Sequence, residues 1–110
     1  MIAMAGTHQI WALNLKTNRA FAFSGTGKES NFNSGQNLKL CEWAQPSSLT
    51  LGLISKSHIE MFVADSESSS VRSINMKTMS SSRNVIGSDS NPKNLHSFGD
   101  KDGVAYEAKL

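Results

Sequence analysis

The chain has 110 residues, a length that normally corresponds to one domain, and 11 Lys and Arg against 9 Asp and Glu give a formal net charge of +2. So small an excess of positive charge argues against nucleic acid or an anionic membrane as a partner. No apolar run approaches the roughly 20 residues that cross a bilayer. Cys41 is the single cysteine and no Asn-x-Ser/Thr sequence occurs, which together favour the cytosol.

Three strands are predicted in the first quarter of the chain, over residues 2–5, 9–15 and 20–23, with turns at 6–8 and 16–19. Apolar and polar residues alternate through 9–15, which is the period of a strand with at least one buried face. Residues 24–39 are rich in glycine and asparagine. We predict no regular structure for that segment.

Four more strands are predicted in the second half of the chain. Pro46 fits the start of the first, because the first residue of a strand need not donate a hydrogen bond. The four apolar runs lie at 49–51, 60–64, 71–76 and 83–86, with loops at 55–58 and 65–70. Serine-rich residues 80–82 predict a turn before the last strand.

One pattern occurs twice in the chain. Residues 3–15 align without gaps on residues 64–76, 61 positions later, and each copy is a β-type run, a small polar turn and an alternating strand. A long fixed period indicates repeat architecture, and hairpin repeats favour a β-propeller or a β-solenoid. A closed propeller takes about four to eight blades. We therefore expect the chain to be a piece of a longer protein.

Residues 61–74 resemble an NHL repeat, in which an apolar strand ends in Ala-Asp-Ser and the strand after the turn opens with an aliphatic residue and arginine. Residues 44–49 resemble the opening of that repeat, and residues 98–110 resemble the linker into the next one. Ser48 stands where the family usually has glycine, and serines replace the usual Asn-His of the turn. The resemblance implies that the positions defining the repeat are Pro46, Val63, Ala64, Asp65, Ser66, Val71, Arg72, Asp102 and Gly103.

The fold that this resemblance implies is all-β, a partial β-propeller with about one complete four-stranded NHL blade and parts of the neighbouring blades. We expect residues 1–23 to end one blade, 24–43 to be a linker, 44–87 to form the complete blade and 88–110 to lead into the next. Trp11 and Trp43 are expected in the apolar core between blades. Asp65 and Arg72 flank a turn, and we expect them to pair across their hairpin at the blade edge.

The function implied by the resemblance is a non-enzymatic scaffold that binds protein partners through loops on one propeller face, because packing occupies the strands. Glu67, Ser68 and Ser69 form the loop expected to contact a partner. Open blade edges also predict self-association. Relatives with an N-terminal thioredoxin-like domain give the alternative, an accessory propeller of a redox protein whose catalytic domain is absent from this chain.

Two loop motifs each lack a residue that ligand binding requires. The run Gly25-Thr26-Gly27-Lys28 lacks both the earlier glycine and the hydroxyl residue after lysine that define a phosphate-binding loop. In residues 100–103, Asp-Lys-Asp-Gly, the glycine comes too early for a calcium-binding EF-hand. We expect a tight turn there, with a positive φ at its glycine.

The remaining reactive side chains are isolated in the sequence. His8, His58 and His96 are scattered through predicted turns, where a solvated histidine is the ordinary finding. Cys41 has no second cysteine and no recognisable base. It is expected to be a thiol in a loop or at the rim. We therefore expect no catalytic site, no metal and no cofactor in this chain.

Overall fold

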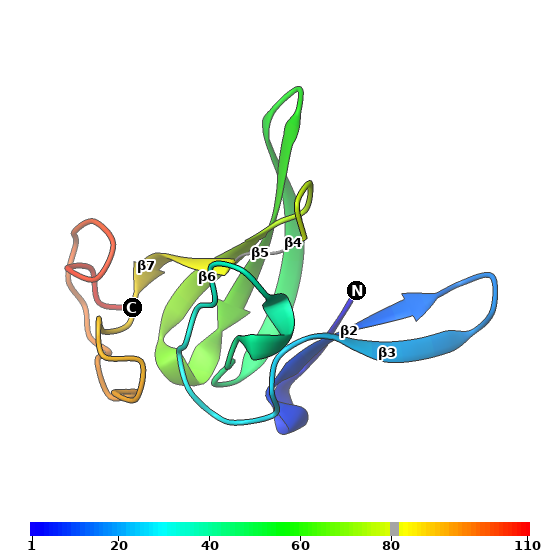
Figure 1. Ribbon diagram of the computed structural model, residues 1–110. Helices are drawn as coiled ribbons and strands as arrows, with labels where there is room; N and C mark the ends of the chain where they lie inside the picture. The colour runs from blue at the N-terminus through cyan, green and yellow to red at the C-terminus, as the bar shows by residue number, and fades with distance from the viewer. Residues whose placement is uncertain (80–81) are drawn as a thin grey trace.

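The computed structural model of the chain describes residues 1–79 and 82–110. Its strands form two separate antiparallel sheets, each in chain order, and neither sheet closes on itself (Figure 1). The first sheet contains β1 (Ile2–Met4), β2 (Gln9–Asn14) and β3 (Arg19–Ser24). The second contains β4 (Pro46–Ser55), β5 (His58–Asp65), β6 (Ser70–Asn75) and β7 (Ser82–Gly87). The protein is an all-β partial propeller, as predicted.

The two sequence copies adopt the same backbone. Short 3-10 turns, η1 (Ala5–Thr7) and η3 (Ser66–Ser68), follow β1 and β5, and each ends in a left-handed residue, His8 with φ 54° and Ser69 with φ 47°. The register of the next hairpin slips at matching places, between Ile10 and Trp11 and between Val71 and Arg72. The repeat is therefore a structural unit and not merely a similarity of composition.

The hairpin formed by β4 and β5 is longer than predicted. Its register continues to a pairing of Ser55 with His58, so the expected loop over 55–58 is wrong and shrinks to a two-residue turn. Leu53 pairs with Ile59 just before that turn, and β-branched and large apolar residues favour extended pairing. Of the serine turn predicted at 80–82, residues 80 and 81 lie outside the described residues, and Ser82 begins β7.

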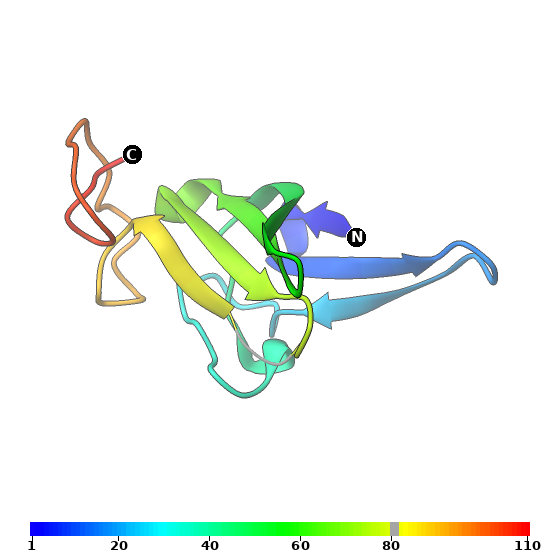
Figure 2. The same cartoon turned by 90° about the horizontal axis from the view of Figure 1, so that it is seen from above.

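Seven buried side chains form the main apolar cluster. The first sheet contributes Ile10, the second contributes Met61, Val63 and Ile74, and the connection over residues 24–43 contributes Leu38, Cys41 and Trp43. The connection is thus part of the core, although we predicted no regular structure in most of it. After Ser24, which ends β3, it contains the 3-10 turn η2 (Leu38–Leu40) and an isolated antiparallel bridge between Phe32 and Glu42. Figure 2 shows β2 and β3 extending away from the second sheet, on the side opposite to the C-terminal segment.

Two predictions about core side chains are corrected here. Cys41 is fully buried in the cluster rather than at a rim, because the connection folds against the second sheet. Trp43 lies in the core as predicted, but Trp11 is only half-buried and lies outside the cluster. Its indole Nε1 donates to Oε1 of Gln9, 2.9 Å away, so its strand neighbour satisfies its polar atom.

Residues 88–110 form no strand, and two isolated bridges hold them, a parallel one between Ile86 and Ala105 and an antiparallel one between Lys101 and Lys109. The positive φ predicted at Gly103 is wrong, since Ala105 has it instead, at 48°. Gly103 is required for space, because a Cβ there would lie 2.9 Å from the backbone nitrogen of Ala108. Among the described residues, no helix has the length and apolar character needed to cross a membrane.

Candidate functional site

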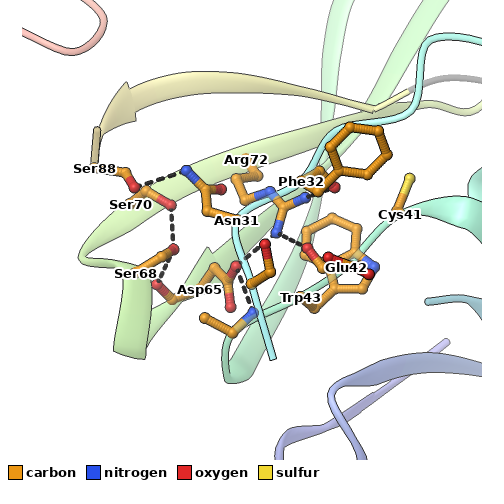
Figure 3. Close-up of polar contacts among 12 residues, drawn as sticks. Asn31, Phe32, Cys41, Glu42, Trp43, Asp65, Ser68, Ser70, Arg72 and Ser88 are labelled. Carbon is orange, nitrogen blue, oxygen red and sulfur yellow. Dashed lines mark hydrogen bonds and ion pairs between the residues drawn. The ribbon is translucent and has the colours of Figure 1, made fainter. Parts of the chain in front are cut away.

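A buried ion pair between Arg72 and Asp65 lies between the second sheet and the connection over residues 24–43 (Figure 3). Asp65 is the last residue of β5 and Arg72 is the third of β6, so the tight turn between these strands brings them together. Arg72 Nη1 donates to Asp65 Oδ2 at 2.7 Å, and both side chains are 0% exposed. The predicted pairing is confirmed, but the predicted place at a blade edge is wrong, because the connection over residues 24–43 covers the pair.

Every N–H group of the Arg72 guanidinium has an acceptor. Besides Asp65, Nη1 donates to the carbonyl oxygen of Glu42 at 2.8 Å, and Nη2 donates to that of Phe32 at 2.9 Å. Nε and Nη2 both donate to Oδ1 of Asn33, at 3.2 and 3.1 Å. Arginine has five donors, and five bonds are present. The guanidinium also stacks on the ring of Trp43, 3.9 Å from its centroid.

The Asp65 carboxylate binds the chain just before β4. It accepts hydrogen bonds from the backbone N–H of Ala44 at 3.1 Å and from that of Gln45 at 2.6 Å. Burial lowers the pKa of Arg72, and the Asp65 charge opposes that shift. The ion pair and the hydrogen bonds to the guanidinium favour its charged form. We call Arg72, Asp65, Asn33 and Trp43, with the backbone groups of residues 32, 42, 44 and 45, the Arg72 network.

A second set of polar contacts lies next to this network. Ser68 Oγ donates to the carbonyl oxygen of Asp65 at 3.1 Å and lies 2.7 Å from Ser70 Oγ. Asn31 Nδ2 donates to Ser88 Oγ at 2.6 Å, which joins the connection to the residue after β7. The polar atoms in this part of the interior therefore join separate chain segments to one another.

Comparison with known proteins gives the relationship. No protein-family model matches the chain. Over 99% of its length it is 42% identical to NHL repeat-containing protein 2 of Bos taurus and of Homo sapiens. The chain is a homologue of the NHL-repeat proteins. It is also 44% identical, again over 99% of its length, to the protein SUPPRESSOR OF QUENCHING 1, chloroplastic, of Arabidopsis thaliana. It spans only 16% of the two animal proteins and 10% of the plant protein.

The residues expected to define the NHL repeat lie in two places: one group on or next to β4, β5 and β6, and two residues in the C-terminal segment. Pro46 and Asp65 are buried and pair in register, and Val63 pairs with Arg72 in the same way. Val71 is half-buried, whereas Ala64 and Ser66 are exposed, and Ser66 Oγ donates to the carbonyl oxygen of Gln45 at 3.0 Å. Asp102 and Gly103 are exposed in the C-terminal segment and are not part of this group.

The loop expected to contact a partner is only partly available for that role. Glu67 is exposed and Ser69 is half-buried, but Ser68 is 0% exposed. The Ser68 hydroxyl is directed inward because it satisfies the Asp65 carbonyl oxygen and pairs with Ser70. Ser68 therefore lies in the interior of the second sequence copy, and the expectation that it contacts a partner is corrected.

Sequence reasoning missed most of the Arg72 network. Asn33 and the carbonyl groups of Phe32 and Glu42 lie in a segment without periodicity, so no local pattern singles them out. One signal was available, because an arginine that alternates with apolar residues toward a buried face must find acceptors. This pattern predicts that Arg72 has hydrogen-bond acceptors, but it does not predict where in the chain those acceptors lie.

Two of the three histidine side chains, His8 and His58, and the Cys41 thiol have partners within the protein. His8 Nδ1 is hydrogen-bonded to the carbonyl oxygen of Ala44, and His58 Nε2 lies 3.1 Å from Glu60 Oε1. Cys41 Sγ lies 3.0 Å from Ser82 Oγ. Within residues 1–79 and 82–110, no three His, Cys, Asp or Glu side chains are grouped so that they could hold a metal ion.

Proposed function

We propose that this chain is part of a non-enzymatic NHL-type propeller that binds protein partners through the loops at the ends of its blade. The observation that carries the proposal is the Arg72 network, in which a buried charge pair has its hydrogen bonds within the protein. Reactive charged groups in an active site must reach a substrate. Here Arg72 and Asp65 hold segments together instead, which suits a rigid support for loops.

The end of the blade that contains η3 offers a small exposed surface. Glu67 is exposed there, with half-buried Ser69 beside it. The opposite end contains the turn between β4 and β5 and the start of the link from β6 to β7, where Lys56 and Lys77 are both exposed. The proposal therefore includes both ends of the blade as contact surfaces.

Site-specific photocrosslinking tests the proposal. A photoreactive residue replaces Glu67 or Lys77 at the two blade ends, or Ser48 as a control on β4, which is also exposed. We expect discrete adducts from the blade ends that excess unmodified chain competes away, and no such adduct from Ser48. If neither blade end gave adducts that excess unmodified chain competes away, the proposal would be contradicted. Catalytic turnover by the purified chain would also contradict it.

The alternative is an accessory propeller beside a redox domain. It draws support from length alone, because the chain spans 16% of the related animal proteins and leaves room for further domains. Cys41 itself is buried, so any thiol chemistry would belong to another segment. We place the scaffold in the cytosol on the evidence of its single cysteine, although one relative is named chloroplastic. Cell fractionation of the tagged full-length protein tests this placement.

A further inference from the structure

Three hairpin turns of the molecule share one composition. They cover residues 15–18 between β2 and β3, residues 54–57 at the β4–β5 turn, and residues 76–79 after β6. None of them contains aspartate or glutamate, and Figure 1 shows the first two at the tips of projecting hairpins. Each turn exposes one lysine and one large apolar side chain, and we call these six residues the turn surface: Lys16 with Leu15, Lys56 with Ile54, and Lys77 with Met79.

The apolar residues of the turn surface lie outside the faces through which blades pack. Leu15 follows the end of β2 and is 82% exposed. Ile54 has no cross-strand partner, because the register of the hairpin slips between Leu53 and Ser55. Met79 lies beyond β6 and has a left-handed φ of 50°. Blades pack through the faces of their sheets and not through the turns between strands, so these side chains stay exposed in a closed propeller.

Two of the turns are built in the same way. The sequence Asn-x-Lys-Thr occurs at 14–17 and again at 75–78, 61 residues later. Asn14 Oδ1 accepts from the two backbone N–H groups of residues 16 and 17, at 2.9 and 3.3 Å, and Asn75 Oδ1 accepts from those of residues 77 and 78, at 2.9 and 3.1 Å. The fold therefore accounts for the asparagine, whereas the repeated lysine side chain has no partner among the described residues.

No carboxylate offsets the positive charge of the turn surface. Within residues 1–79 and 82–110, its three lysines take part in no ion pair. The acidic residue closest to them in sequence, Glu60, is 4% exposed and is already paired with Arg83. The net charge of +2 for the whole chain does not describe this end, because exposed carboxylates such as that of Glu67 lie elsewhere.

We propose that the turn surface binds an anionic lipid bilayer. The side chains of Leu15, Ile54 and Met79 enter the boundary between headgroups and acyl chains, where apolar groups leave water. The three ammonium groups lie at the level of the headgroups, and each adds a modest attraction to a negatively charged surface. A bilayer offers an apolar layer beneath its charges, which a soluble acidic protein does not. The η3 end of the blade then stays available for the protein partner proposed above.

Flotation of the full chain with lipid vesicles tests the inference. Vesicle-bound chain floats in a density gradient, whereas self-associated chain sinks. The vesicles are phosphatidylcholine alone or phosphatidylcholine mixed with phosphatidylserine. We expect flotation only with the mixed vesicles, and less of it at high salt, because surface charges are then screened. No flotation with the mixed vesicles, or equal flotation with both kinds, would overturn the proposal.

A lysine variant and its control locate the positive charge that binds. The variant replaces the three lysines of the turn surface, and the control replaces three exposed lysines elsewhere. Binding should weaken by roughly fivefold for each lysine lost from the turn surface and should be unchanged in the control. Equal losses in the two proteins would refute the assignment. The substitutions are Lys16→Ser, Lys56→Ser and Lys77→Ser in the variant, and Lys28→Ser, Lys93→Ser and Lys101→Ser in the control.

An apolar variant separates a bilayer from an acidic protein as the partner. Replacing the three apolar residues of the turn surface should weaken vesicle binding by at least about tenfold, whereas the control should bind as the wild type does. If the apolar variant bound vesicles normally and the chain bound soluble polyglutamate equally well, charge alone would be recognised and the bilayer proposal would be wrong. The substitutions are Leu15→Ser, Ile54→Ser and Met79→Ser in the variant, and Leu40→Ser, Phe98→Ser and Val104→Ser at exposed control positions.

The membrane contact and the scaffold function can fail independently. If vesicles do not bind but competed adducts form at Glu67, the membrane proposal is wrong and the scaffold function stands. If the chain floats with the mixed vesicles but gives no competed adduct at either blade end, the membrane contact is supported and the scaffold function is wrong.

Discussion

Replacing Asp65 with asparagine should strongly destabilise the protein. The change keeps the size of the side chain but leaves the Arg72 charge buried without its counterion, and both side chains are 0% exposed. Breaking a buried ion pair by removing one partner costs about 3–5 kcal/mol. The carboxylate also accepts from the backbone N–H groups of Ala44 and Gln45, and the amide cannot replace all of these bonds. The free energy of unfolding of a typical protein is about 5–15 kcal/mol, so this loss would remove much of the stability.

Urea unfolding followed by tryptophan fluorescence measures this effect, because Trp43 stacks directly on the Arg72 guanidinium. The matched control is Asp102→Asn, an exposed aspartate whose change should stay within about 0.5 kcal/mol. Adding Arg72→Met to Asp65→Asn removes the orphaned charge and should recover part of the loss. If the unfolding free energy of Asp65→Asn lies within about 0.5 kcal/mol of the wild-type value, the Arg72 network does not hold the connection in place.

Four further predictions concern other parts of the molecule. Val63→Asp should abolish folding, because it buries an unpaired carboxylate in the apolar cluster, whereas Ser69→Ala should change the unfolding free energy by less than about 0.5 kcal/mol; equal soluble yields would contradict this. Burial raises the pKa of Glu60, but the nearby Ser73 hydroxyl, the hydrogen bond from Arg83 and the Arg83 charge outweigh it and hold the pKa below its usual 4.5. The stability from Glu60 is therefore present above pH 4.5 and is lost as the pH falls below it, so acid titration should lower the unfolding midpoint less in Glu60→Gln than in the wild type. The purified chain should show no ATP binding, no calcium binding and no thiol exchange faster than a free cysteine peptide, with Cys41→Ser as the control; saturable micromolar binding of either ligand would refute this. Open sheet edges and exposed apolar residues should make the chain unstable or self-associating, and a monomer with one sharp, concentration-independent thermal transition would show the opposite.

The regular hairpins could be predicted from the sequence because local signals specify them. Two of these signals are local: the alternation of residues 9–15, which follows strand periodicity, and the proline at 46, which fits the start of a strand. The 61-residue offset adds that the same local pattern occurs twice. The Asp65–Arg72 pairing follows from the same short turn. Its burial could not be predicted, since the covering residues Phe32, Asn33 and Glu42 lie 30 or more positions before Arg72.

The position of Cys41 has the same explanation. Its segment is irregular and polar, which is typical of a surface loop, yet the side chain is fully buried. Tertiary contacts override the local composition, because Leu38 and Trp43 pack into the same cluster. A lone thiol in an irregular segment therefore gives no reliable indication of exposure from sequence alone.

The Arg72 network has a consequence for folding cooperativity. In the first repeat the positions aligned with Asp65 and Arg72 are Met4 and Trp11, so only the second copy contains the charged pair. All acceptors of Arg72 lie outside β6, and no single hairpin can satisfy the guanidinium. The second sheet and the connection must therefore open together, and their slowest amide hydrogens should exchange as one unit. The first hairpin, which contributes none of these acceptors, can fray without them.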